Sequence, residues 1–435
     1  MIVGLFAVIA VGTAGFVGSR MRSIDDAYSD LIANMDFATA MTARGNGLSQ
    51  VYLSAGYQLS TQTTTAGNAL LLAQARDAKQ TATNAWTDAQ AHLVKAGQTA
   101  FAARMDANLA LQIKNLRVVF TKTSGVLGSR VTEVRAIENF SLDLRKSEVL
   151  SIVGESGSGK TTLLRCIMKL QDPTSGSVIY NGVDLTKISG GKKLLDFRRE
   201  VQMVFQDPYE CLNPRQTVYA MISMPIRYLL GEKDESKIEQ MVSDLLEEVS
   251  LTPSETLNKF AHQLSGGERQ RVNIAKALAP NPKVLLLDEP ITMLDAAQRL
   301  NVLHLLSELR KKRDLTLLMI THDLASSKVI SDRIVVMYLG KEVEIGPVNE
   351  VLYKPYHPYV ELIRESMPSL KSLDQDPAEL STVPMRRIEE TVTAGCVFRP
   401  RCKYATEVCK TVDPKLEEKS RLHLAACHNP LNAIS

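Results

Sequence analysis

The chain has 435 residues, which is too many for one compact domain at about 150 residues per domain. Apolar residues make up 45% of it, so it can build a sizeable core, and its formal net charge is only +3. No basic stripe with interleaved aromatic residues occurs along the chain, which argues against a DNA- or RNA-binding protein. We therefore expect several domains and no nucleic-acid partner.

The chain starts with an apolar segment that carries no charge from Ile2 to Gly18 and is followed by Arg20 and Arg22. This length is close to the lower limit of about 17 residues for a membrane span. A cleaved signal peptide would have a basic stretch ahead of the apolar run, and that stretch is missing. Basic residues after the run favour a cytoplasmic position for its C-terminal flank. We expect a transmembrane helix over residues 1–19.

Residues 20–107 form a second, distinct segment. It has no proline from Met21 to Ala107 and is rich in Ala, Gln, Thr and Asn, which indicates two or three polar helices. Together with the apolar run it resembles the start of a methyl-accepting chemotaxis receptor, whose helical ligand-binding bundle returns through a second span. No second span occurs after this segment. The segment is either a fused, incomplete bundle or an appendage with no sensing role, and we favour the appendage.

A glycine-rich loop follows the apolar stretch Val149–Val153 and precedes a helix-prone run. Backbone N–H groups in such a loop converge on phosphate oxygens, and the start of the helix adds a partial positive charge. Lys160 can reach the β- and γ-phosphates, while the hydroxyl of Thr161 can ligate Mg²⁺. The residues expected to hold the phosphates are Gly154, Glu155, Ser156, Gly157, Ser158, Gly159, Lys160, Thr161 and Thr162. The strand before the loop and the helix after it argue against a turn that binds nothing.

Two adjacent carboxylates, Asp288 and Glu289, close a second apolar strand pattern about a hundred residues further on. A phosphate loop alone also fits kinases, GTPases and motor ATPases. Asp288 can hold Mg²⁺ through water, and Glu289 can polarise the attacking water. The pair narrows the choice to NTPases that keep their general base beside the metal-binding aspartate.

Between these two strands lies the run from Leu264 to Arg271, which contains Ser265, Gly266 and Gly267. Here the chain resembles the nucleotide-binding subunit of an ABC transporter. In that family this segment begins a helix that faces the γ-phosphate held by the partner subunit, so two chains enclose two ATP molecules. Glycines permit this close approach, and a helix N-terminus favours an anion.

Three further positions match the family's pattern, and their roles here are those the resemblance implies. Gln206 would reach Mg²⁺ and the water, and His322 would hydrogen-bond the γ-phosphate. Asp295 would communicate across the dimer interface. Phe120 is the candidate for stacking on adenine, although an insertion from Thr123 to Val131 separates it from the next strand.

The resemblance implies an α/β fold of the P-loop NTPase type. We expect a mainly parallel core sheet, an antiparallel β subdomain near Leu109 to Asp143, and a helical subdomain from about Gln206 to Leu278 that meets membrane subunits. The ABC ATPase domain would span residues 108–350, and a C-terminal extension would span residues 351–435.

The extension contains four of the six cysteines, Cys396, Cys402, Cys409 and Cys427, with five, six and seventeen residues between them. Thiols stay reduced in the cytosol, so a metal site is favoured over disulfides. Zinc sites usually pair cysteines two to four residues apart, whereas four thiolates can hold an iron–sulfur cluster. Zinc and unliganded thiols stay open as alternatives.

The extension also resembles the C-terminal region of the oligopeptide and dipeptide ABC subfamily, through His357-Pro358-Tyr359 and the run from Gly395 to Cys402. Some members of that subfamily bind a [4Fe–4S] cluster through cysteines spaced in this way. The resemblance therefore implies a cluster on the four cysteines.

We expect an ATP-binding and ATP-hydrolysing subunit that energises an importer for peptides or related small solutes, at the cytoplasmic face of the membrane. Its cofactors would be ATP and Mg²⁺. Its implied partners are two permease subunits, a second ABC ATPase subunit and an extracytoplasmic solute-binding protein. Peptides, nickel and oligosaccharides remain open as substrates. The alternatives are a soluble ABC ATPase of DNA repair or translation, and a membrane-tethered nucleotide sensor.

Overall fold

The computed structural model describes residues 109–124, 130–365 and 394–432. The expected membrane helix over residues 1–19 and the helical segment over residues 20–107 lie outside the described residues. No helix among the described residues has both the length and the apolar character needed to cross a membrane.

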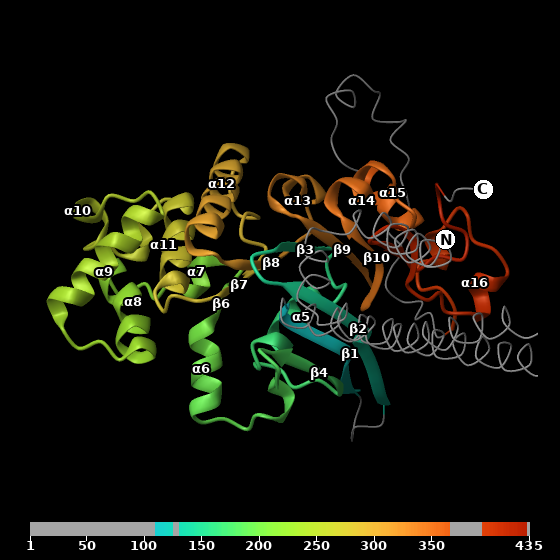
Figure 1. Cartoon of the computed structure of the whole chain (residues 1–435), viewed down its shortest axis with the longest axis horizontal. Coiled ribbons are helices and arrows are strands. Elements are labelled where there is room, and N and C mark those ends of the chain that lie inside the picture. Colours follow the sequence, from blue (N-terminus) through green and yellow to red (C-terminus); the bar gives the residue numbers. More distant parts are fainter. Residues whose placement is uncertain (1–108, 125–129, 366–393, 433–435) are drawn as a thin grey trace, which may run out of the picture. The chain divides into compact units, whose positions relative to one another are not determined.

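An eight-stranded sheet forms the centre of this part, in the order β11-β12-β10-β9-β3-β8-β7-β6. Figure 1 labels its strands from β10 to β6. The strands from β9 to β6 run parallel, while β10, β12 and β11 add antiparallel neighbours. Strands β3, β7 and β8 are buried at every position, as expected for parallel strands covered on both faces. The strands are β3 (Val149–Val153), β6 (Val201–Val204), β7 (Val284–Asp288), β8 (Thr316–Thr321), β9 (Arg333–Tyr338), β10 (Lys341–Pro347), β11 (Glu417–Ser420) and β12 (His423–Ala425).

A second, antiparallel sheet has the order β2-β1-β4-β5. Its strands are β1 (Leu109–Ser124), β2 (Arg130–Arg145), β4 (Ser175–Tyr180) and β5 (Val183–Asp184). Helix α5 (Lys160–Ile167) contributes Leu163 and Leu164 to the apolar cluster that joins this sheet to one face of the central sheet, and α6 (Lys192–Glu200) adds Phe197. The phosphate loop therefore leaves the central sheet at β3 and enters a helix that is fixed by both sheets.

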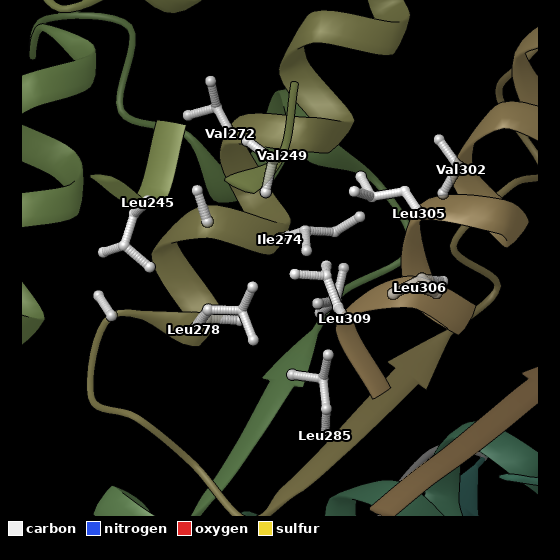
Figure 2. Packing of buried hydrophobic residues seen from close by; sticks show 14 of the residues in the cluster. Leu245, Val249, Val272, Ile274, Leu278, Leu285, Val302, Leu305, Leu306 and Leu309 are labelled. Carbon is white, nitrogen blue, oxygen red and sulfur yellow. The ribbon is translucent and has the colours of Figure 1, made fainter. Parts of the chain in front are cut away.

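Further helices cover the other face of the central sheet and extend into a helical subdomain. These helices are α7 (Pro208–Cys211), α8 (Val218–Pro225), a π-helical turn η3 (Ile226–Leu230), α9 (Glu235–Glu248), α10 (Pro253–Thr256), α11 (Gly266–Leu278), α12 (Ala296–Arg313) and α13 (Leu324–Ile330). Figure 2 shows how Leu245 from α9, Ile274 from α11 and Leu309 from α12 meet above Leu285 of β7. This apolar cluster ties the helical subdomain to the sheet.

The C-terminal extension joins the central sheet. Its elements are α14 (Val348–Tyr353), α15 (Pro358–Glu365), η6 (Arg399–Arg401), α16 (Val408–Thr411) and the strands β11 and β12. The buried carboxylate of Glu344, on β10, accepts hydrogen bonds from the backbone N–H groups of Tyr356 (3.0 Å) and His357 (2.6 Å) and lies 2.6 Å from Nε2 of buried His423. A third apolar cluster, which includes Tyr359, Cys396, Phe398 and Cys409, lies between the extension and β9.

The predicted fold class is confirmed: the central sheet is mainly parallel, an antiparallel subdomain packs on it, and helices α7 to α11 fill the range expected for the helical subdomain. The antiparallel subdomain is larger than expected, since β4 and β5 lie beyond the predicted range of Leu109 to Asp143.

Candidate functional site

The phosphate loop runs from the end of β3 to the start of α5, close to the backbone of β9 and β2. A side chain at Gly154 would put its Cβ 2.1 Å from the carbonyl oxygen of Met337, and one at Gly159 would meet the carbonyl oxygen of Ala136 at 2.2 Å. Gly159 also has a φ of +100°, in the left-handed region. Only glycine fits at both positions, so the loop can keep its N–H groups open to an anion.

The Lys160 ammonium lies over its own loop. Its Nζ donates to the carbonyl oxygens of Gly154 (2.7 Å) and Glu155 (2.8 Å) and to Oγ of Ser158 (3.3 Å). Burial lowers the pKa of Lys160, while the charges of Glu289, Asp288 and Glu155 act in the opposite direction. The loop therefore holds the Lys160 ammonium close to the position that a phosphate would take when bound by the N–H groups of the loop.

The two residues expected to bind Mg²⁺ come together although they lie far apart in the sequence. Oγ1 of Thr161 donates to Oδ1 of Asp288 at 3.4 Å. Burial, followed by the charge of Glu289, raises the pKa of Asp288 to about 6. A divalent cation at this position would favour the ionised carboxylate, because opposite charges favour the charged form.

The Glu289 carboxylate is the centre of a small polar network. Its Oε2 accepts hydrogen bonds from Nε2 of Gln206 (3.2 Å) and from Oγ1 of Thr292 (3.0 Å), and it lies 3.2 Å from Nδ1 of His322. Glu289 has a φ of 44°, an uncommon value for a residue other than glycine, and its N–H donates to the carbonyl oxygen of Ile320. Thr292 was not singled out from the sequence.

The order of the strands explains why these side chains meet. Gln206, Glu289 and His322 follow the carboxyl ends of β6, β7 and β8, which are neighbours in the central sheet. In parallel sheets ligands bind at the carboxyl ends of the strands. The predicted catalytic residues therefore lie together at one edge, next to Asp288 and the phosphate loop.

The Ser265 segment starts helix α11. Oγ of Ser265 accepts the N–H of Glu268 (3.3 Å) and the Glu268 carboxylate accepts the N–H of Ser265 (2.7 Å), which forms a capping box. Gly267 faces Gln298, whose Oε1 would lie 2.2 Å from a Cβ at this position. Asp295 caps α12 by accepting the N–H of Gln298 at 2.9 Å.

Two predicted residues, Ser265 and Asp295, make their hydrogen bonds away from the phosphate loop. Within the described residues, no hydrogen bond joins Ser265 or Asp295 to the loop. Phe120 lies on β1 opposite Val134 and is 41% exposed. The adenine contact of Phe120 stays a prediction.

The four cysteines of the extension carry free thiols. Burial raises the pKa of Cys427 to about 12, and the charges of Cys396, Cys402 and Cys409 act in the same direction, so all four lie in one neighbourhood. The Cys396 N–H donates to the carbonyl oxygen of Cys409 at 2.9 Å, and the Cys396 carbonyl oxygen accepts the N–H of Arg399 at 3.2 Å. Over residues 109–124, 130–365 and 394–432, no group of three or more His, Cys, Asp or Glu side chains is arranged to hold a metal ion. Four thiolates are donors that an iron–sulfur cluster takes, but among the described residues these side chains are not arranged around one metal position.

Comparisons with known proteins identify the class. A family model described as ABC transporter matches residues 137–292, and one described as Oligopeptide/dipeptide transporter, C-terminal region, matches residues 343–409. The oligopeptide transport ATP-binding protein AppF of Bacillus subtilis (strain 168) is 36% identical over 330 residues, which cover 73% of this chain and 96% of AppF. OppF, the oligopeptide transport ATP-binding protein of the same organism, is 43% identical over 258 residues, covering 59% of this chain and 82% of OppF. A solved structure of the ATP-binding cassette MJ0796 bound to ADP and Pi aligns with a TM-score of 0.49 at 28% identity, covering 55% of this chain and 98% of that one.

The fold and the matched regions define an ABC-type ATPase that couples ATP hydrolysis to transport. The chain belongs to the ATP-binding proteins of the oligopeptide/dipeptide ABC import family. Membership implies ATP and Mg²⁺ as cofactors, and permease subunits and a second ATPase subunit as partners.

Proposed function

We propose that this chain hydrolyses ATP at the phosphate loop to drive the uptake of peptides. It would lie at the cytoplasmic face of the membrane, bound to two permease subunits, and would receive its cargo from an extracytoplasmic solute-binding protein. No nucleic acid takes part. The observation that carries this proposal is the network at Glu289, which joins Gln206, Thr292 and His322 next to Asp288. The peptide cargo is supported by the C-terminal match and by the relatives named for oligopeptide transport.

Nucleotide binding follows from the loop geometry. The N–H groups of the loop and the start of α5 receive the phosphates, and Lys160 exchanges its hydrogen bonds to Gly154 and Glu155 for phosphate oxygens. Thr161 and Asp288, with Gln206, would hold Mg²⁺, which supplies charge neutralisation at the phosphates when bound. Phe120 would stack on the base.

Hydrolysis needs a base beside the γ-phosphate. Glu289 takes a proton from the attacking water, whose oxygen forms a bond to phosphorus as the bond to the leaving phosphate breaks. Gln206, Thr292 and His322 orient the Glu289 carboxylate and the water. Ser265, Gly266, Gly267 and Asp295 would complete the site on the partner ATPase subunit.

Uptake by the reconstituted complex tests the cargo. Proteoliposomes that hold the permease subunits and both ATPase subunits should accumulate a labelled oligopeptide when the binding protein is outside and ATP is inside. Excess unlabelled peptide should abolish the signal, whereas nickel and an oligosaccharide should leave it unchanged. Uptake of nickel or sugar without peptide uptake would overturn the peptide assignment and leave the ATPase assignment standing.

We further propose that Cys396, Cys402, Cys409 and Cys427 hold a [4Fe–4S] cluster. Four thiols of one segment support this proposal, because Cys396 and Cys409 lie in the same buried cluster and Cys402 packs against it. The four sulfur atoms would have to approach one another to ligate the cluster. Its role would be structural, since it would fix a segment with few regular elements.

Anaerobically purified protein should be brown, and Cys402→Ser should remove the visible absorption and most of the iron. Cys211→Ser is the matched control, because Cys211 lies in the helical subdomain, and it should keep the colour. Colourless preparations with neither iron nor stoichiometric zinc would show that the four cysteines are ordinary thiols.

A further inference from the structure

The C-terminal extension holds one residue of the phosphate loop from two sides. The two terminal nitrogens of Arg401 donate to the two carboxylate oxygens of Glu155, at 2.8 and 2.9 Å. Oη of Tyr359 accepts the backbone N–H of Glu155 at 3.0 Å. Both contacts cross more than 200 positions of sequence, so the extension contacts the loop directly.

Arg401 is well placed for this contact. It ends the turn η6, and its side chain is 18% exposed against 48% for Glu155. Its guanidinium lies 5.8 Å from the ring centres of Tyr338 and Phe398. Buried Tyr359 packs against both rings, with centroid distances of 4.6 Å to Tyr338 and 5.4 Å to Phe398. A bidentate, partly buried arginine on an aromatic support has little freedom to move away.

The electrostatic effect concerns the nucleotide. Glu155 places a carboxylate in the same loop that receives phosphates, and its carbonyl oxygen already holds the Lys160 ammonium at 2.8 Å. Like charges repel, so this carboxylate opposes a bound phosphate. Arg401 offsets the carboxylate and draws it toward the extension.

We propose that Arg401 is a positioning residue for nucleotide binding, which acts through Glu155 and makes the C-terminal extension part of the ATP site of its own chain. Tyr359 fixes the backbone of Glu155 through its hydrogen bond to the Glu155 N–H. The inference rests on the phosphate loop being the nucleotide site.

Equilibrium binding of MgADP to the full chain tests it without turnover. Arg401→Ala should raise the dissociation constant about 3- to 5-fold, the upper range expected when a partly exposed charge loses its partner. The difference should shrink as salt rises from about 50 to about 500 mM, because ions screen the repulsion. Arg401→Lys keeps the charge, and its dissociation constant should stay within about twofold of the wild-type value.

In steady-state assays Arg401→Ala should raise KM for ATP and leave kcat nearly unchanged.

A double variant separates this role from general support of the fold. In a Glu155→Gln background, Arg401→Ala should cause no further loss, since no carboxylate remains to be offset. Lys403→Ala removes a positive charge from the same segment, at an ion pair with Glu361, and should not change MgADP affinity. An equal loss in both backgrounds, an equal effect of Lys403→Ala, or no effect of Arg401→Ala would overturn the inference. If the wild-type chain itself did not bind MgADP, the proposed nucleotide site would be wrong instead.

Discussion

Glu289→Gln should lower ATP turnover by about 10²–10⁴-fold, the usual contribution of a positioned general base, while ATP still binds. Glutamine has the same shape as glutamate and can keep hydrogen bonds to Thr292 and Gln206, so the network at 3.0 and 3.2 Å need not reorganise. It cannot take the proton of the attacking water. The substitution therefore removes the base that accepts the proton of the attacking water and leaves the ATP-binding residues unchanged.

Phosphate release and nucleotide binding, measured on the same preparation, check this expectation. Because ATP would persist between the subunits, the variant should also accumulate as a closed dimer in MgATP, visible by sedimentation. Glu308→Gln is the matched control, since Glu308 is exposed on α12 and undergoes the same chemical change. Turnover equal to that of the wild type would remove Glu289 from its assigned role.

The local motifs made much of this site predictable. The phosphate loop is one continuous stretch, and its strand, glycines and helix follow one another in the sequence, so Lys160 and Thr161 could be assigned from sequence alone. The meeting of Gln206, Glu289 and His322 depends on β6, β7 and β8 being adjacent, and strand order is set by tertiary packing rather than by spacing. Only the family resemblance predicted that these three residues lie close together.

The extension was the least predictable part. Strand β11 has the sequence Glu417-Glu418-Lys419-Ser420, which carries no alternating apolar pattern, and β12 has three residues. Strand β12 pairs with β10, about 80 positions earlier in the chain, and β11 pairs with β12. The contact of Arg401 with Glu155 has no local signature either, because an arginine beside a cysteine is ordinarily a solvated charge.

Ser265→Arg should block hydrolysis in the assembled ATPase but leave nucleotide binding to the isolated chain unchanged. In this chain Ser265 caps α11 and makes no hydrogen bond to the phosphate loop among the residues that the structure describes. A bulky cation at the start of this helix would prevent close approach to nucleotide held by the partner subunit. The effect on turnover should be a loss of about 10²-fold or more, since an incomplete site lacks the preorganised groups that stabilise the transition state.

The loss of the cap itself must be separated from this effect. Ser265→Ala also removes the side chain that accepts the Glu268 N–H, at a cost of about 1 kcal/mol in helix stability, but it adds no bulk. It should therefore retain much more turnover than Ser265→Arg, and both variants should bind MgADP as monomers with wild-type affinity. If the arginine variant bound nucleotide weakly as a monomer, Ser265 would act on the site of its own chain. The head-to-tail arrangement of two ATPase subunits would then not apply to this protein.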